Sequence, residues 1–390
     1  MPLPAQLRAF FPALGAAFAR ATGSGAVVCP ASRVVLLPDA PAPEADAGAS
    51  ARTPIAWRVR CVPALGEKQR ARQQRAAQQD AAQQQQKPAE EQKDVFAPPY
   101  DSDLFVAELP EHTVLLNKYA LLPLHFLLVT KEFASQKLPP PPATLALAYA
   151  LLQEHARSPV GEGRSADAEL MAFYNCGPLS GASQPHCHVQ FIECSLEAGE
   201  TEDVVGKRGE GRVPVERLLH TCIEQEGRDD SIFALPLPYQ HFVALLSPPE
   251  GEASSARESY LMSKLLGLLD ALFKAKLSAV AGASGSAAAP VRSGPPSFNL
   301  LMTARALHLV PRTQEDFELP LASGEKTALS INSMAYAGHL LTKSEEELQA
   351  LQALSGGVRA VLQSAGASGV QDVTMGVQDE PAVAASGTKE

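Results

Sequence analysis

The residues best suited to chemistry in this sequence stand at every second position. His186, His188 and Gln190 occur in "GASQPHCHVQF" (residues 181–191), whose later part is rich in the β-branched and aromatic residues of strands. Because side chains alternate between the faces of a strand, these three are expected to share one face, with the residues between them turned to the core. The sequence therefore predicts a row of two imidazoles and one amide.

A loop of small polar residues precedes this row. The stretch "NCGPLSGAS" (residues 175–183) is rich in glycine, serine and asparagine. Such a loop can turn several backbone N–H groups toward an anion, and Ser180 and Ser183 add hydroxyl donors. We therefore expect an anion cradle beside the imidazoles.

Two readings of the row involve no covalent chemistry. The histidines can simply be hydrogen-bonded residues of a half-exposed strand. Alternatively, an H-x-H pair can offer two imidazoles to one metal ion, and the spacing of Gly181, His186, His188, Glu193 and Gly199 approximates a cupin motif. Strict alternation nevertheless places Glu193 on the face opposite His188, and no second motif follows downstream.

A third reading is nucleophilic catalysis at phosphorus. An imidazole with an ordinary pKa near ~6.5 is largely neutral at pH 7 and has a free lone pair. Its attack on an α-phosphate would give a nucleotidyl-imidazole, which a second nucleophile then consumes. The reaction needs a fixed tautomer and hydrogen-bond donors for the phosphate oxygens, which the row and the loop can supply.

Composition narrows the classes of partner. The 390 residues include 33 Lys and Arg against 43 Asp and Glu, a net charge of −10, which argues against a nucleic-acid-binding protein. No apolar run approaches the roughly 18 residues of a membrane span. The six cysteines form no C-x-x-C pair, which is typical of reduced thiols in a cytosolic protein. We expect a cytoplasmic protein, with the nucleus left open.

The remaining pattern predicts an α+β fold, with a mixed or antiparallel sheet and helices packed on one side of it. Apolar residues at helical spacing predict an N-terminal helix that Gly23 and Gly25 end, in preference to a transit peptide. Further helices are expected over residues 142–155, 257–276 and 344–363. The expected strands are "AVVCPASRVVLL", "IAWRVRCV", "LFVAEL", "HTVLLNKYAL", "HFLLVT", "PHCHVQFIEC", "HFVALL", "SFNLLMT" and "LHLVPR".

Segments of low hydrophobicity divide the chain. Flexible loops are predicted at 69–93, 195–213 and 278–296, and a disordered tail at 364–390. We therefore divide the chain into an N-terminal catalytic part (1–200), which carries the H-x-H-x-Q motif, and a C-terminal segment (215–363).

The segment "SGASQPHCHVQ" resembles the active site of the histidine-triad superfamily, in the branch whose third histidine is replaced by glutamine. That branch includes galactose-1-phosphate uridylyltransferase and the fungal-type diadenosine tetraphosphate phosphorylases, also called ATP adenylyltransferases. The agreement with the phosphorylases runs from about residue 7 to 356 and favours them. It rests on "RVRCVPALGEK", "FAPPY", "NKYALLPLHFLLVTKEFASQ", "LPYQHFVALL", "SFNLLMT", "VPR" and "INSMAYAGHLL".

The resemblance implies an antiparallel sheet of the histidine-triad, or GalT-like, type and a nucleotidyltransferase activity. His188 would be the nucleophile and form an adenylyl-histidine from diadenosine tetraphosphate, with His186 and Gln190 assisting. Inorganic phosphate would accept the adenylyl group, so that the products are ADP and ATP. We expect the His188 ring to be exposed beside the polyphosphate pocket.

The resemblance also implies a set of phosphate- and nucleotide-binding residues. They are Lys68, Asn117, Lys118, Asn175, Ser180, Gly181, Ala182, Ser183, Gln184 and Arg312. For Arg312, a phosphate contact and a surface cap remain equal alternatives, and His125 is expected to be structural. "TARALH" (residues 303–308) departs from the family, because Ala304 and Ala306 replace a longer polar residue and an aromatic one.

No structural metal and no tightly bound cofactor are expected, although Mg²⁺ can accompany the polyphosphate. The expected partners are small molecules only, and the expected state is a monomer. Two other functions stay open. One is a sister transferase acting on a nucleotide sugar, and the other is a nucleotide-binding protein that has lost turnover.

Overall fold

The structure is a computed structural model, and the description that follows concerns the residues whose placement it defines. These are residues 3–38, 55–66, 94–157, 167–197, 200–201, 212–227, 232–248, 254–282 and 296–367.

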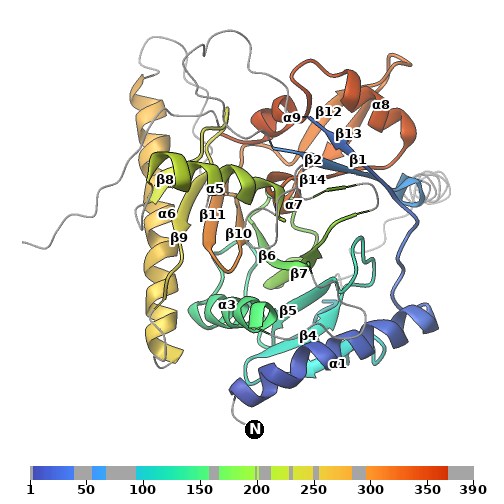
Figure 1. The fold of residues 1–390 in the computed structure, drawn as a ribbon, viewed down its shortest axis with the longest axis vertical. Coiled ribbons are helices and arrows are strands. Elements are labelled where there is room, and N and C mark those ends of the chain that lie inside the picture. The colour runs from blue at the N-terminus through green and yellow to red at the C-terminus, as the bar shows by residue number, and fades with distance from the viewer. Residues whose placement is uncertain are drawn as a thin grey trace, which may run out of the picture.

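A nine-stranded antiparallel sheet forms the centre of the molecule (Figure 1). Its order is β3 (Phe105–Glu108), β4 (His112–Leu116), β5 (Phe126–Thr130), β7 (His188–Cys194), β6 (Glu169–Cys176), β10 (Phe298–Met302), β11 (Ala306–Pro311), β9 (Phe242–Leu245) and β8 (Ile232–Ala234). The first five strands come from the predicted N-terminal part and the last four from the C-terminal segment. Both parts therefore build one sheet, joined where β6 pairs with β10.

Three helices cover one face of this sheet. They are α1 (Leu3–Ser24), α3 (Pro142–Arg157) and α6 (Ser254–Gly282), and their apolar side chains form one core with those of the strands. The predicted N-terminal helix is confirmed, and it ends just before Gly25, whose φ of 77° is costly for other residues. None of the helices in the described ranges is both long and apolar enough to cross a membrane.

A second layer covers the other face and forms its own core. It contains a small sheet of β1 (Arg33–Leu37), β2 (Trp57–Cys61) and β14 (His339–Thr342), and the hairpin of β12 (Asp316–Pro320) and β13 (Lys326–Ser330). The helices of this layer are α5 (Pro214–Glu226), α7 (Ser333–Ala337), α8 (Glu345–Ala353) and α9 (Gly357–Ala365). The α+β prediction is thus confirmed, but the expectation of helices on one side is wrong, because helices pack on both faces of the sheet.

Strand β7 lies inside the sheet between β5 and β6. His188 pairs with Val129 of β5, and Gln190 pairs with Phe173 of β6. Val189 belongs to the core under the helices, as alternation requires, so His188 and Gln190 face the second layer. The regular strand begins at His188, and His186 lies just before it.

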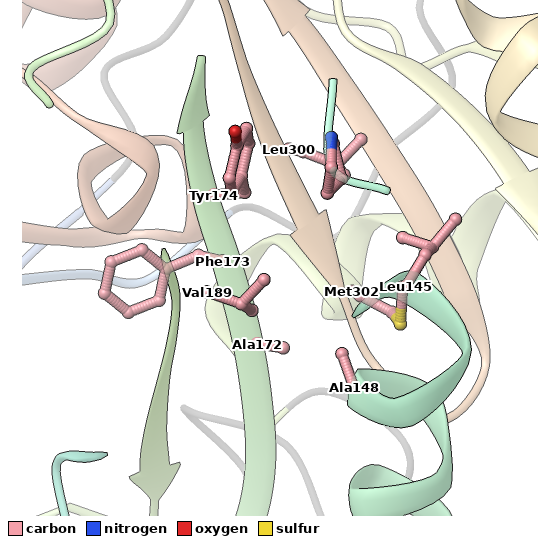
Figure 2. A pocket seen from close by; sticks show the side chains of 9 residues that line it. Leu145, Ala148, Ala172, Phe173, Tyr174, Val189, Leu300 and Met302 are labelled. Carbon is pink, nitrogen blue, oxygen red and sulfur yellow. The ribbon is translucent and has the colours of Figure 1, made fainter. Parts of the chain in front are cut away.

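The helical face of β7 leaves no room for a nucleotide. A cavity of about 10 Å³ lies between α3 and the sheet, about the space of one water molecule. Figure 2 shows Val189 and Ala172 directed toward Leu145 and Ala148 of α3. Ligand chemistry therefore belongs to the opposite face.

Some predicted boundaries are wrong. The expected helix over 344–363 is two helices, because the backbone turns at Gly356, which has a φ of 77°. Residues 278–282, predicted as loop, continue α6. Residues 364–367 of the predicted tail are packed, since Gln240 donates its N–H to the Ala367 carbonyl oxygen.

Part of the predicted loop 195–213 is anchored instead of free. The Arg58 guanidinium makes a two-pronged ion pair with Glu200, at 2.9 and 2.7 Å, and both side chains are buried. The predicted loop 69–93 lies outside the described residues.

Candidate active site

The His188 ring has a defined tautomer. Its Nδ1 lies 2.8 Å from the carbonyl oxygen of His186, which can only accept a hydrogen bond. The neutral ring must therefore carry its proton on Nδ1 and its lone pair on Nε2. Nε2 makes no hydrogen bond to any residue in the described ranges, so the lone pair is available for bonding.

Burial keeps this ring neutral. His188 is only 2% exposed, and desolvation by burial lowers its pKa to about 4. The backbone N–H of His188 is held by the Gln136 side chain at 2.8 Å, which fixes the start of β7. A neutral, fixed imidazole is a competent nucleophile at physiological pH.

The predicted exposure of this ring is wrong, because the segment from Asp94 folds over it. The Phe96 ring lies 5.0 Å from the His188 ring, centroid to centroid. Asp94 holds the segment by accepting the Phe96 N–H at 2.9 Å and by contacting His186 Nδ1 at 2.7 Å. The Phe96 ring is therefore one of the groups that bury His188.

His186 stands beside His188 but serves as a support. Its Nε2 lies 3.0 Å from Thr130 Oγ1, and its Nδ1 faces Asp94. Both ring nitrogens are thus engaged, while the backbone carbonyl fixes His188. A hollow of about 340 Å³, lined in part by Thr130 and Phe133, adjoins this ring.

Gln190 contacts a third histidine. Its Oε1 lies 3.1 Å from His125 Nε2, at the start of β5. The same ring nitrogen lies 3.1 Å from Asn117 Nδ2. Asn117, predicted to bind the nucleotide, is therefore connected through His125 to the row of His186, His188 and Gln190. Lys118, its neighbour, is exposed.

The loop before β7 divides into an accessible part and a buried part. Gly181, Ala182, Ser183 and Gln184 are partly or fully exposed beside the row, where a cradle was predicted. Ser180 is fully buried, and its hydroxyl donates to the Gly177 carbonyl oxygen at 2.7 Å. Ser180 therefore braces the loop, contrary to the predicted phosphate contact.

Asn175 is the centre of a buried hydrogen-bond network that holds this loop, which we call the brace. Its Oδ1 accepts from Asn299 Nδ2 at 2.9 Å and from the Ser333 N–H and hydroxyl at 3.0 and 2.6 Å. The Asn299 amide also donates to the Ser180 carbonyl oxygen at 2.9 Å. Asn175 is 2% exposed, so it holds the loop from inside and leaves no surface for the predicted nucleotide contact.

Arg312 is the last member of the buried hydrogen-bond network that holds this loop, together with Asn175 and Asn299. Its guanidinium donates to the side chain of Asn299 at 2.6 Å and to the carbonyl oxygens of Ile331 and Gln314 at 2.7 and 2.6 Å. The two remaining N–H groups, one on Nη2 and one on Nε, donate to the carbonyl oxygens of Glu315 and Ala365, and Nη1 also lies 3.4 Å from the Ser180 carbonyl oxygen. The surface-cap alternative is therefore wrong, since the side chain is buried, and the N–H groups that a phosphate contact would need are directed at protein acceptors.

Two further residues named in the sequence analysis are Lys68 and Glu193. Lys68 lies outside the described residues. Glu193, the acidic member of the cupin-like spacing, lies on the helical face and contacts His155 of α3 at 2.7 Å. The predicted placement of Glu193 on the face opposite His188 is thus confirmed. Within the described ranges, no group of three His, Cys, Asp or Glu side chains is placed to hold a metal ion.

Sequence reasoning missed the supporting residues. Asp94, Phe96, Gln136, Asn299 and Ser333 all act on the catalytic row or its loop through contacts between distant segments. Four of these residues lie in segments quoted above for the family resemblance, "FAPPY", "NKYALLPLHFLLVTKEFASQ", "SFNLLMT" and "INSMAYAGHLL", but no spacing rule indicated the contacts.

Gly181 gives the loop a testable weak point. Its φ is 77°, and a Cβ there would lie 2.8 Å from the Ile331 carbonyl oxygen and 2.9 Å from Asn332 Cβ. We expect Gly181→Ala to lower kcat/KM for the expected substrate, diadenosine tetraphosphate, by more than about tenfold. A displaced loop would move its N–H and hydroxyl donors away from the phosphate oxygens. The strain should also cost about 1–3 kcal/mol in the free energy of unfolding, measured by denaturant titration.

Gly324→Ala is the matched control. Gly324 has a φ of 87° but open space around it, in the β12–β13 hairpin. It should share the backbone strain and keep its activity. Equal activity in the two variants would show that the loop does not depend on Gly181.

Comparison with known proteins agrees with this geometry. The model of the Ap4A phosphorylase N-terminal domain matches residues 48–208, and that of the ATP adenylyltransferase C-terminal domain matches residues 235–368. The chain is 29% identical over 269 residues to diadenosine 5',5'''-P1,P4-tetraphosphate phosphorylase 2 of Saccharomyces cerevisiae, covering 66% of this chain and 71% of that protein. It is 28% identical over 244 residues to Protein APA1 of the same organism, covering 62% and 64% respectively.

Solved structures show the same fold. Yeast Ap4A phosphorylase Apa2 in complex with AMP superposes with a TM-score of 0.62 at 22% identity, covering 93% of this chain and 98% of that one. Its complex with Ap4A gives a TM-score of 0.59 at 23% identity, covering 92% and 97%. The two family models together span most of the chain, so this protein belongs to the Ap4A phosphorylase and ATP adenylyltransferase family of nucleotidyltransferases.

Proposed function

We propose that this protein phosphorolyses diadenosine tetraphosphate, using inorganic phosphate to give ADP and ATP, through an adenylyl group carried on His188. The observation that carries the proposal is the 2.8 Å hydrogen bond between His188 Nδ1 and the His186 carbonyl oxygen. It leaves the lone pair on Nε2 of a ring that is neutral at pH 7. Family membership supports the choice of substrate.

In the first step, the Nε2 lone pair forms a bond to an α-phosphorus of the dinucleotide. The bond from this phosphorus to the bridging oxygen breaks, and ATP leaves with the electron pair. The ring now carries the adenylyl group and a positive charge, which the carbonyl oxygen of His186 stabilises through the Nδ1–H.

In the second step, an oxygen of inorganic phosphate attacks the adenylyl phosphorus. The P–N bond breaks, the electron pair returns to Nε2, and ADP forms. Splitting the transfer in this way replaces one difficult step by two easier ones.

The neighbouring groups have separate tasks in this scheme. Gln190 donates hydrogen bonds to the adenylyl phosphate, and the exposed loop residues Gly181, Ser183 and Gln184 receive the polyphosphate. Because Gln190 is uncharged, it cannot act as a general base that activates water, which favours transfer to phosphate. Lys68 and Lys118 supply positive charge for the polyphosphate. A Mg²⁺ ion that arrives with the substrate would screen further charge.

Incubation with radiolabelled diadenosine tetraphosphate tests the proposal directly. Without phosphate, the protein should release one ATP and retain a labelled adenylyl group in an acid-labile linkage. With phosphate, ADP and ATP should appear in equal amounts.

Other products would replace the proposal. Binding without turnover would identify a nucleotide-binding protein, and equally fast phosphorolysis of a nucleotide sugar would identify a sister transferase. Formation of AMP in place of ADP would identify a hydrolase.

The low pKa of His188 predicts an unusual pH profile. A histidine with an ordinary pKa would be about 90% protonated at pH 5.5 and react about tenfold more slowly than at high pH. With a pKa of about 4, His188 stays almost fully neutral there. We expect the rate of adenylylation, measured in single turnovers without phosphate, to change less than about twofold between pH 7.5 and 5.5.

Stability must be followed in the same experiment. A buried histidine whose pKa is lowered in the folded state stabilises that state above its unfolded pKa. This contribution is lost as pH falls from about 6.5 toward 4. Circular dichroism at each pH separates unfolding from protonation of the nucleophile, and a tenfold loss of rate in folded protein would contradict the prediction.

A further inference from the structure

His125 forms a junction directly behind the catalytic row. Its side chain is 3% exposed and precedes β5, whose Leu127 pairs with Gln190. A single ring nitrogen, Nε2, lies 3.1 Å from Gln190 Oε1 and 3.1 Å from Asn117 Nδ2. The ring thus touches two amides with one atom.

The Asn117 amide has a defined orientation. Its Oδ1 accepts the backbone N–H of Tyr119 at 3.0 Å, so its NH₂ group faces the imidazole. A single ring nitrogen cannot accept from Asn117 and donate to Gln190 at the same time. The tautomer of His125 therefore decides which amide is bonded.

The other ring nitrogen resolves the choice. His125 Nδ1 is buried and has no hydrogen-bond partner among the described residues. Burial lowers the pKa of His125 to about 4, so the ring has one proton at neutral pH. Buried donors without acceptors are rarer than buried acceptors without donors, which puts the proton on Nε2.

We propose that His125 is a positioning residue, which donates Nε2–H to Gln190 Oε1 and so directs the Gln190 NH₂ group toward the phosphate carried on His188. The inference rests on the proposed function. Asn117 is half-exposed and can bond water through its NH₂ group instead.

The orientation of an amide matters at this position. The two ends of a carboxamide have nearly the same shape but opposite hydrogen-bonding character. A flipped Gln190 would present its carbonyl oxygen to the negatively charged oxygens of the phosphate. Fixing Oε1 on the imidazole excludes that arrangement and keeps two donors on the reacting group.

Two variants at position 125 separate this role from packing. Phenylalanine keeps a ring but has no donor, whereas the Nε2 of glutamine can place an N–H close to that of the imidazole. We expect His125→Phe to lower kcat by about ten- to a hundredfold with little change in KM, because a transition-state donor is lost. His125→Gln should restore most of kcat.

A double-mutant cycle tests whether His125 acts through Gln190. In a Gln190→Ala background, His125→Phe should cause no further loss of kcat, because there is no amide left to orient. His112→Phe is the matched control: His112 is a buried histidine of the adjacent strand β4, hydrogen-bonded to Thr144. It should lower the free energy of unfolding and leave kcat unchanged.

Three results would overturn the proposal. They are equal losses in the phenylalanine and glutamine variants, multiplicative losses in the cycle, and an Nδ1 proton on His125. The last is measured on the wild-type protein by ¹⁵N–¹H correlation of the histidine rings, and it needs no variant that folds. An inactive wild-type protein would refute the proposed function, while the ring spectrum would still report the His125 proton.

Discussion

Replacing His188 with alanine is expected to reduce phosphorolysis by at least about 10⁴-fold, because no other group can carry the adenylyl intermediate. His186 cannot substitute for it, since both of its ring nitrogens are engaged by Asp94 and Thr130. The measurement is kcat for ATP and ADP release. The labelled adduct should also disappear.

Binding should survive this substitution. The loop at 181–184 and its brace do not depend on the imidazole, so the dissociation constant for diadenosine tetraphosphate should change less than about tenfold, by calorimetry. His220→Ala is the control and should retain full turnover, since this half-buried residue of α5 contacts Glu224 at 3.2 Å and lies outside the row and its loop. Turnover in His188→Ala within tenfold of wild type would refute the covalent mechanism.

Replacing Arg312 with alanine should have the largest effect on stability. Its buried guanidinium donates to Asn299 and to carbonyl oxygens of three separate segments, around Ser180, Ile331 and Ala365. Removing it leaves those acceptors unpaired and opens a cavity. We expect a loss of about 3–5 kcal/mol in the free energy of unfolding and a fall in kcat as the loop relaxes.

Two control variants show whether the loss of stability comes from the hydrogen bonds of Arg312 or only from its charge. Arg312→Lys keeps the charge but not the planar fork, so it should recover only part of the stability. Lys326→Ala, in an exposed ion pair with Glu318, should leave stability and activity near wild type. If Arg312→Ala instead weakens substrate binding without loss of stability, the phosphate contact considered from the sequence would be right.

Residues whose role follows from strand alternation could be predicted from sequence. The period of two placed His188 and Gln190 on one face and Glu193 on the other, and both placements are confirmed. This argument is local, since it needs only the identity of neighbours along one strand. The apolar periodicity of α1 succeeded for the same reason.

Strand β6, next to the catalytic strand, could not be recognised in this way. All eight of its residues are buried, so its sequence shows no alternation of polar and apolar side chains. The burial of His188 was missed for a different reason. It depends on Phe96, 92 positions before the nucleophile, and a sequence does not show which distant segment folds over a site.

Arg312 illustrates the limit for charged residues. An arginine after a strand is compatible with a phosphate ligand, a cap or a buried brace. Only the carbonyl oxygens that converge on it distinguish the three. Those acceptors belong to the backbone, and their direction is a property of the folded chain.

The brace beneath the loop has a consequence for biosynthesis. Asn175 meets Ser333 across 158 positions, and Ser180 meets Arg312 across 132. A ribosome therefore synthesises His188 long before the residues that hold the loop beside it. Contacts between residues so far apart in the sequence form slowly. A growing or prematurely terminated polypeptide would therefore contain His188 without the contacts that hold the loop beside it. These contacts can form only after Arg312 and Ser333 have been synthesised.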